Sequence, residues 1–176
     1  MIRKLASRVV YKNRWMIVRE DRVAFADGAS GIYGVVEKED FALIVPYDGD
    51  RFHLVRQYRY PVGAAFWEFP MGGAPGSEVE PAELARQELL EETGLRCARI
   101  EKIGYLYEAY GYSNQGFHVF LARDLESGAP KREVSEQGME TRAVSVPEFE
   151  RMVETGKIRD APTLSAYGLL RLKGII

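Results

Sequence analysis

The stretch from Gly72 to Leu95 places the tightest constraint on the fold of this chain. A glycine-rich loop, GGAPGSE at residues 72–78, runs into Pro81. Proline suits the first turn of a helix, because its missing N–H would have no intrahelical partner there. Gly94 supplies the left-handed residue with which many helices end. The sequence therefore predicts a loop followed by a helix that starts at Pro81 and closes at Gly94.

The predicted helix carries an acidic face. At 100° per residue, Glu88, Glu91 and Glu92 share an arc of roughly 100°, and like charges at this spacing destabilise a bare helix. A hard divalent cation removes that repulsion, and Mg²⁺ typically binds a few carboxylates together with substrate phosphates. The alternative is a solvated acidic face with partners at Arg86 or Lys102. The flanking pattern favours the metal site.

That pattern resembles the Nudix box, Gly-x5-Glu-x7-Arg-Glu-apolar-x-Glu-Glu-x-Gly-apolar. The second half of the box matches without change, at Glu88, Leu89, Glu91, Glu92, Gly94 and Leu95. By this likeness Glu88, Glu92 and Glu91 would hold Mg²⁺, with Mn²⁺ as the alternative cation. The metal-binding half of the motif is therefore expected to be intact.

The first half of the box departs from the pattern. Gly72-x5-Glu78 matches, but the loop before Pro81 is then one residue too long, and a count without a gap puts Val79 at the first glutamate. The arginine of the box corresponds to Gln87. In the family this glutamate and arginine form an ion pair that braces the loop against the helix, so the brace is expected to be weaker or rebuilt here.

The order of motifs outside the box is similar to the ADP-ribose pyrophosphatase branch of the family. QYRYP at residues 57–61 is followed by WEFP at residues 67–70, and the ending at residues 156–164 also resembles this branch. The likeness implies an α+β Nudix fold, an α/β/α sandwich with a mixed central β-sheet, preceded by an antiparallel strand segment. We expect residues 1–38 to form that N-terminal β segment and to dimerise, and residues 39–176 to form the hydrolase domain.

Period-two apolar runs and turn residues predict the strands. In the first segment these are Arg8–Tyr11, Trp15–Arg19, Arg22–Phe25 and Ile32–Glu37. In the second they are Phe41–Val45 and Phe52–Tyr58, joined as a hairpin through residues 47–50, then Ala98–Tyr107 and Phe117–Ala122. A polar loop is expected over 123–137, a helix capped by Ser145 and ending at Gly156, and a last helix capped by Asp160.

The resemblance also implies the remaining site residues. Arg59 would bind the substrate diphosphate through its guanidinium; the alternative is a structural ion pair with Glu68 or Glu108. Glu68 and Tyr110 are placed beside the substrate, Tyr110 standing where the branch has proline. The backbone carbonyl of Met71 would be a further metal ligand.

The general base is expected near the last strand. Several enzymes of this branch use a loop glutamate at the position that corresponds to Gln137, and glutamine cannot accept the proton. The neighbouring Glu136 is the predicted base, with Glu133 and Glu140 as alternatives, and Glu91 or Glu88 of the box could serve instead. His118 alternates with apolar residues and is expected to be a strand-face residue.

These residues favour a Mg²⁺-dependent hydrolase that splits ADP-ribose or a related nucleotide sugar, giving AMP and ribose 5-phosphate from ADP-ribose. The alternatives are a dinucleoside polyphosphate or nucleoside triphosphate pyrophosphohydrolase, and a Nudix domain that binds a nucleotide sugar without turnover. Glutamines 87, 115 and 137, at or near positions where the family has charged residues, motivate the last.

Composition bounds the partners and the compartment. A net charge of −2 over 176 residues argues against a nucleic-acid partner, and no apolar run has the length of a membrane span. A single cysteine, Cys97, permits no intrachain disulfide and predicts a cytoplasmic protein.

Trp15 lies in the first segment, whose apolar groups cannot bury themselves within it. We therefore expect a homodimer, in which Trp15 stacks on the nucleobase or packs in a core.

Overall fold

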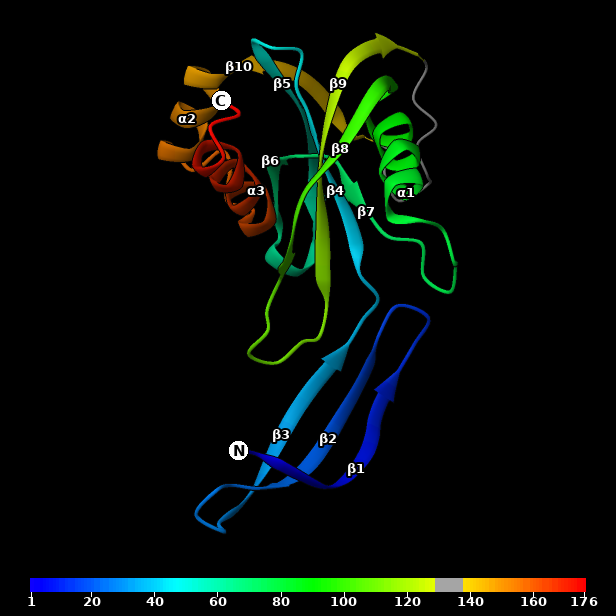
Figure 1. Cartoon of the computed structure of the whole chain (residues 1–176), viewed down its shortest axis with the longest axis vertical. Coiled ribbons are helices and arrows are strands. Elements are labelled where there is room, and N and C mark those ends of the chain that lie inside the picture. Colours follow the sequence, from blue (N-terminus) through cyan, green and yellow to red (C-terminus); the bar gives the residue numbers. More distant parts are fainter. Residues whose placement is uncertain (129–137) are drawn as a thin grey trace.

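The computed structural model describes residues 1–128 and 138–176. The first part of the chain is a three-stranded antiparallel sheet that projects away from the rest of the molecule (Figure 1). Its strands lie in sequence order, β1 (Arg3–Lys12), β2 (Ile17–Ala24) and β3 (Ser30–Glu37).

Strand β2 corrects the prediction of two strands, Trp15–Arg19 and Arg22–Phe25. The strand runs without a break through Glu20 and Asp21 because both charges have partners: Arg8 pairs with Glu20 at 3.0 Å and Arg19 with Asp21 at 3.4 Å. The turn before it is set by Asn13, whose side-chain oxygen accepts from the backbone N–H of Trp15 and Met16, each at 2.8 Å.

The second part of the chain contains two sheets. One has four strands in the order β7-β4-β9-β8 and the other three in the order β10-β5-β6. The pair β4–β9 is parallel and the remaining pairs are antiparallel. The strands are β4 (Phe41–Pro46), β5 (Arg51–Arg59), β6 (Ala64–Glu68), β7 (Met71–Gly72), β8 (Leu95–Tyr107), β9 (Gly116–Ser127) and β10 (Glu140–Ser145).

Two strand predictions are wrong in detail. The predicted hairpin does not form: β4 and β5 belong to different sheets and meet only at an isolated bridge between Tyr47 and Phe52. Strand β4 instead pairs with β7 and β9. Arg123–Ser127, expected in a polar loop, extend β9 along β8. Gly128 follows the strand, and residues 129–137 of the predicted loop lie outside the described residues.

Helices cover both sides of the sheets (Figure 1). On one side α1 (Pro81–Glu88) continues as a π-turn, η2 (Leu89–Thr93), and ends at Gly94 with φ of 73°. On the other side lie α2 (Val146–Glu154) and α3 (Ala161–Leu172). A short 3₁₀ turn, η1 (Tyr60–Val62), follows β5. The predicted α+β sandwich with mixed strand pairing is confirmed.

Two apolar clusters hold the layers together. Ala85 and Leu89, fully buried, pack with Ile44 and Phe120 of the four-stranded sheet. On the other side an aromatic cluster joins the three-stranded sheet to α2 and α3, with Phe69 and Phe149 stacked at 5.4 Å. This packing fixes the end of β6 and the start of β7, which lie at the candidate site.

The helix caps follow the sequence. Ser145 accepts from the Glu148 N–H at 3.4 Å, and Asp160 accepts from the Thr163 N–H at 2.8 Å.

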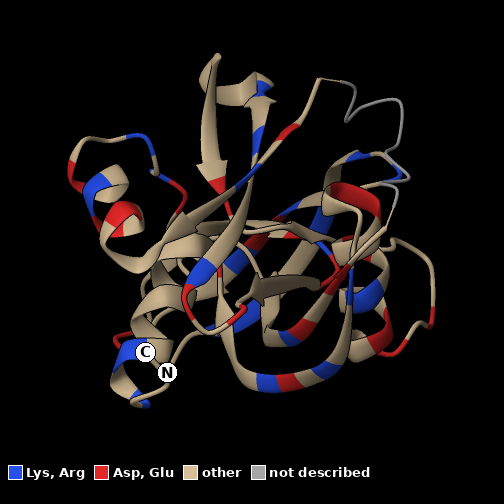
Figure 2. Cartoon of the chain, turned by 90° about the horizontal axis from the view of Figure 1, so that it is seen from above, with Lys and Arg blue, Asp and Glu red and all other residues tan. Residues whose placement is uncertain are grey.

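Basic and acidic residues are intermingled along the strands and helices (Figure 2). Within residues 1–128 and 138–176, no helix has the length and apolar character needed to cross a lipid bilayer.

Candidate active site

A cavity of about 1110 Å³ opens where the N-terminal sheet meets the rest of the chain. Its walls come from the β1–β2 turn, residues 38–41, the ends of β5 and β6, the glycine-rich loop, the β8–β9 loop and the α2–α3 turn. Four of the predicted site residues line it: Trp15, Arg59, Glu68 and Met71. Segments far apart in the sequence therefore converge at one place.

Arg59 and Glu68 form an ion pair at the wall of this cavity. The Arg59 Nε donates to Glu68 Oε2 at 3.3 Å and Nη2 contacts Oε1, while Gln57 Nε2 donates to the same carboxylate at 3.0 Å. Burial raises the pKa of Glu68 and nearby Asp160 raises it further, while Arg59 and Gln57 lower it. The structural ion pair considered for Arg59 is thus present, and the Arg59 side chain stays 41% exposed at the cavity.

Glu88 and Glu92 turn toward strand β7. The Met71 N–H donates to Glu92 Oε2 at 3.1 Å, and the Glu88 carboxylate lies against the α-carbon of Gly72, so that a Cβ there would clash with it. Both glutamates are buried. The π-turn changes the angular spacing after Glu88, so the regular 100° spacing assumed for the acidic face does not apply to Glu91, which is half-buried.

The donors at β7 suit a hard divalent cation. Two buried carboxylates and the backbone of Met71 offer oxygen ligands, which Mg²⁺ prefers, and this ion usually completes its shell with water and substrate phosphates. Within the described ranges, no three His, Cys, Asp or Glu side chains are grouped so that they could hold a metal on their own.

The glycine-rich loop is held by a residue that the sequence did not indicate. Gly76 N–H donates to Glu39 Oε2 at 2.9 Å, and Gln115 Nε2 donates to the Glu39 carbonyl at 2.7 Å. Glu78 and Gln87, at the positions of the family's brace, are exposed. Glu39 has no motif around it, and only the fold brings it to the loop.

The N-terminal sheet is tied to the β8–β9 loop. The Val36 N–H donates to the Tyr112 carbonyl at 2.8 Å and the Lys38 N–H to Asn114 Oδ1 at 3.0 Å. This attachment brings Trp15 to the cavity, with the Arg14 guanidinium 4.1 Å from its ring centroid. Tyr110, in the same loop, is 83% exposed and is not among the residues that line the cavity.

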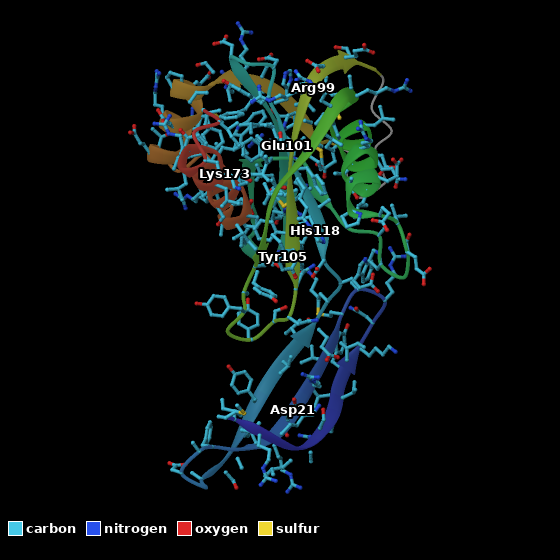
Figure 3. All side chains as sticks on the ribbon, in the orientation of Figure 1. Asp21, Arg99, Glu101, Tyr105, His118 and Lys173 are labelled. Atoms are coloured by element: carbon cyan, nitrogen blue, oxygen red, sulfur yellow. The ribbon has the colours of Figure 1, made fainter. Side chains whose placement is uncertain are left out.

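His118 lies on the face of β9, as expected. Its ring centroid is 5.0 Å from that of Tyr105 on β8, and Figure 3 shows the two side by side. Burial and nearby Lys102 lower the pKa of His118, and Asp40 opposes them. His118 does not line the cavity. The predicted base Glu136 and its alternative Glu133 lie outside the described residues.

The structure is an α+β sandwich with two buried glutamates beside a glycine-rich loop, and comparison with known proteins specifies the family. Residues 38–167 match the model of the NUDIX domain, and residues 2–36 match the nucleoside diphosphate sugar hydrolase N-terminal domain. The chain belongs to the Nudix family and is a Nudix hydrolase, and members of this family generally use divalent cations.

Similar proteins include two curated ADP-ribose pyrophosphatases. The one from Bacillus subtilis is 33% identical over 133 residues, 75% of this chain and 71% of the relative. The one from Mycobacterium tuberculosis is 30% identical over 156 residues, 88% and 75% respectively. A crystal structure of an ADP compounds hydrolase shares the fold, with a TM-score of 0.85 and 22% identity over 98% of this chain and 95% of that one. The resemblance to the ADP-ribose pyrophosphatase branch is confirmed.

Proposed function

We propose that this Nudix hydrolase cleaves the diphosphate of ADP-ribose, or of a related nucleotide sugar, with Mg²⁺ as cofactor. The observation that carries the proposal is that one cavity of about 1110 Å³ joins Trp15, Arg59 and the glycine-rich loop. It offers an aromatic surface for a base, a guanidinium for phosphate and, in its wall, Met71 and Gly72 of β7. The buried carboxylates of Glu92 and Glu88 lie against these two residues. The relatives named ADP-ribose pyrophosphatase support this substrate class.

Different residues of the chain have different roles in the proposed cleavage of the diphosphate. Little covalent chemistry is required of the protein, because positioning and charge stabilisation dominate phosphoryl transfer. Arg59 presents its guanidinium to the diphosphate, while Glu68 fixes its orientation. Glu88, Glu92 and the Met71 carbonyl would hold the divalent cation, with Glu91 as a further candidate ligand. When bound, that cation neutralises phosphate charge and lowers the pKa of water.

Two glutamates are candidates for the base that receives the proton of the attacking water. Glu91 lies half-buried on the π-turn beside the proposed metal ligands, and Glu136 remains the candidate from the resemblance. Water attack on one phosphorus of ADP-ribose breaks the bridging P–O bond, giving AMP and ribose 5-phosphate. Glu68 and Tyr110 are kept as substrate-binding candidates, Glu68 through Arg59 and Tyr110 from the loop that borders the site.

A nucleotide panel tests the proposal. Release of the nucleoside monophosphate and of its phosphate-bearing co-product is measured for ADP-ribose, GDP-mannose, a dinucleoside polyphosphate and a nucleoside triphosphate, each with Mg²⁺, Mn²⁺ or EDTA. Preferred turnover of ADP-ribose with Mg²⁺ is expected. Faster release from the triphosphate or polyphosphate would favour the second function, and binding of ADP-ribose without product would indicate a sensor.

We further propose a cytoplasmic homodimer built through the N-terminal sheet. This sheet exposes large apolar side chains, among them Val9 at 60% and Ile32 at 66%, and two-fold association is the commonest way to cover such a face. Because Trp15 already reaches the cavity of its own chain, the partner's contribution would complete that pocket from outside. A monomeric mass by light scattering at micromolar concentration would refute the dimer.

A further inference from the structure

Arg159, to which the sequence analysis assigned no role, is a cation in the cavity wall. It lies in the turn between α2 and α3 and lines the cavity together with Arg59 and Lys38. These three are the cations among the residues that line the cavity. In the sequence, Arg159 directly precedes Asp160, the predicted cap of the last helix.

The turn that carries Arg159 is fixed to the strands behind the cavity. The Trp67 N–H donates to the Lys157 carbonyl at 3.1 Å, and the Phe69 N–H donates to Thr163 Oγ1 at 2.9 Å. Ile158 beside it is buried at 2% exposure. The backbone at Arg159 is therefore held at both ends against β6 and the residues that follow it.

The guanidinium itself is preorganised. Its Nε donates to the Gly156 carbonyl at 3.0 Å, and its plane lies over the Phe66 ring with 5.4 Å between Cζ and the ring centroid. Gly156 has φ of 69°, and a Cβ there would come within 2.9 Å of Arg159 Nη2. The side chain is thus folded over a glycine in the left-handed region, and less ordering entropy is lost when a ligand binds.

The charges around the cavity leave Arg159 available. Arg59 is engaged by Glu68, whereas within the part of the chain that the structure describes Arg159 makes no ion pair. Four acidic side chains that line the cavity accept hydrogen bonds from other groups: Glu39 from Gly76, Asp40 from Gly116, Glu68 from Arg59 and Asp160 from Thr163. A guanidinium that is planar, charged and held in place suits a phosphate, which it binds bidentately.

We infer that Arg159 is a second substrate-binding arginine that contacts the diphosphate of the bound nucleotide sugar. The inference rests on the proposed function for the identity of the substrate. ADP-ribose carries its negative charge only on the diphosphate, so a cation in this cavity has one target. The diphosphate is charged in the ground state and the transition state alike, and Arg159 therefore contributes mainly to binding, not to the chemical step.

Steady-state kinetics with ADP-ribose test the inference. Arg159→Gln and Arg159→Met are expected to raise KM by about tenfold or more, which corresponds to ~1.4 kcal/mol, with kcat within about threefold. Arg159→Met keeps the apolar stem over Phe66 and so separates charge from packing. Arg159→Lys is expected to recover part of the loss. Arg151→Gln, an exposed arginine on α2 outside the cavity, is the matched control and should behave as wild type.

A binding measurement separates this inference from the proposed function. The affinity for ADP is measured by calorimetry in EDTA at two salt concentrations; Arg159→Gln is expected to weaken binding and to reduce its salt dependence. Variants that match wild type in both KM and ADP affinity would overturn the inference while leaving the function in place, and so would a fall in kcat alone. A wild type that binds ADP but turns over no nucleotide rejects the proposed function, and the ADP titration still decides the role of Arg159.

Discussion

Gly72→Ala tests whether the Glu88 carboxylate is a ligand of the catalytic cation. Gly72 ends strand β7, directly before the glycine-rich loop. A Cβ added there would lie under 3.0 Å from the carboxylate atoms of Glu88, a separation that real Cβ atoms essentially never show, whereas ordinary contact begins at 3.4 Å. The carboxylate must therefore withdraw from its present position.

The geometry sets the size of the expected effect. Mg–O distances are confined to ~2.0–2.1 Å, so a withdrawal of roughly 1 Å removes Glu88 as a ligand, and misplacement on this scale costs about 100-fold in rate. The fold should tolerate the change, because the displaced atoms are the end of a flexible side chain. We expect kcat for ADP-ribose hydrolysis with Mg²⁺ to fall about 100-fold while the free energy of unfolding changes by no more than ~1 kcal/mol.

Gly73→Ala is the matched control. It is the next residue of the same loop and also lines the cavity, but its Cβ would meet Asp40 and Phe41 at an ordinary 3.5 Å. Activity in Gly72→Ala within a few-fold of wild type would show that Glu88 is not a ligand. Equal losses in both variants would indicate that the loop needs glycine for its backbone and would remove the argument from the carboxylate.

Three further predictions concern other residues of the site. Glu92→Gln, and separately Glu88→Gln, should abolish Mg²⁺-dependent turnover, and circular dichroism should show an unchanged fold; activity at saturating Mg²⁺ would reject the ligand. Gln87→Arg should change the free energy of unfolding by no more than ~1 kcal/mol, because Gln87 is exposed; urea titration measures this, and a large loss would contradict it. The pKa of buried Glu68 is raised above 4.5, so its contribution to stability is complete below pH 4.5 and is lost as pH rises through the folded-state pKa; urea titrations should show this fall in wild type and not in Glu68→Gln.

The sequence specified the elements whose signals are local. Pro81 and Gly94 bound the helix of the box, and Ser145 and Asp160 cap the last two helices, because capping depends on a few adjacent residues. These signals, together with the resemblance, were sufficient for the α+β sandwich.

Features that depend on pairing between distant segments were not predictable. Strands β4 and β5 flank a turn and look like a hairpin, but β4 is buried within the four-stranded sheet, where it finds β7 and β9. Likewise Glu20 and Asp21 appeared to break a strand, and only Arg8 and Arg19 explain why they do not. The π-turn at Leu89 has no signal in composition, and it changes the angular spacing of Glu91 from that of a regular α-helix.

In this chain the glycine-rich loop of the box is held by a hydrogen bond to Glu39 and not by the ion pair typical of the family. The family's glutamate–arginine pair holds the loop to its own helix, whereas Glu39 holds Gly76 from the segment that links the N-terminal sheet to the hydrolase domain. Gln115 of the β8–β9 loop binds the backbone of that same Glu39. The loop, the linker and the β8–β9 loop are therefore joined by one residue, and the position of the glycine-rich loop depends on how the N-terminal sheet is seated.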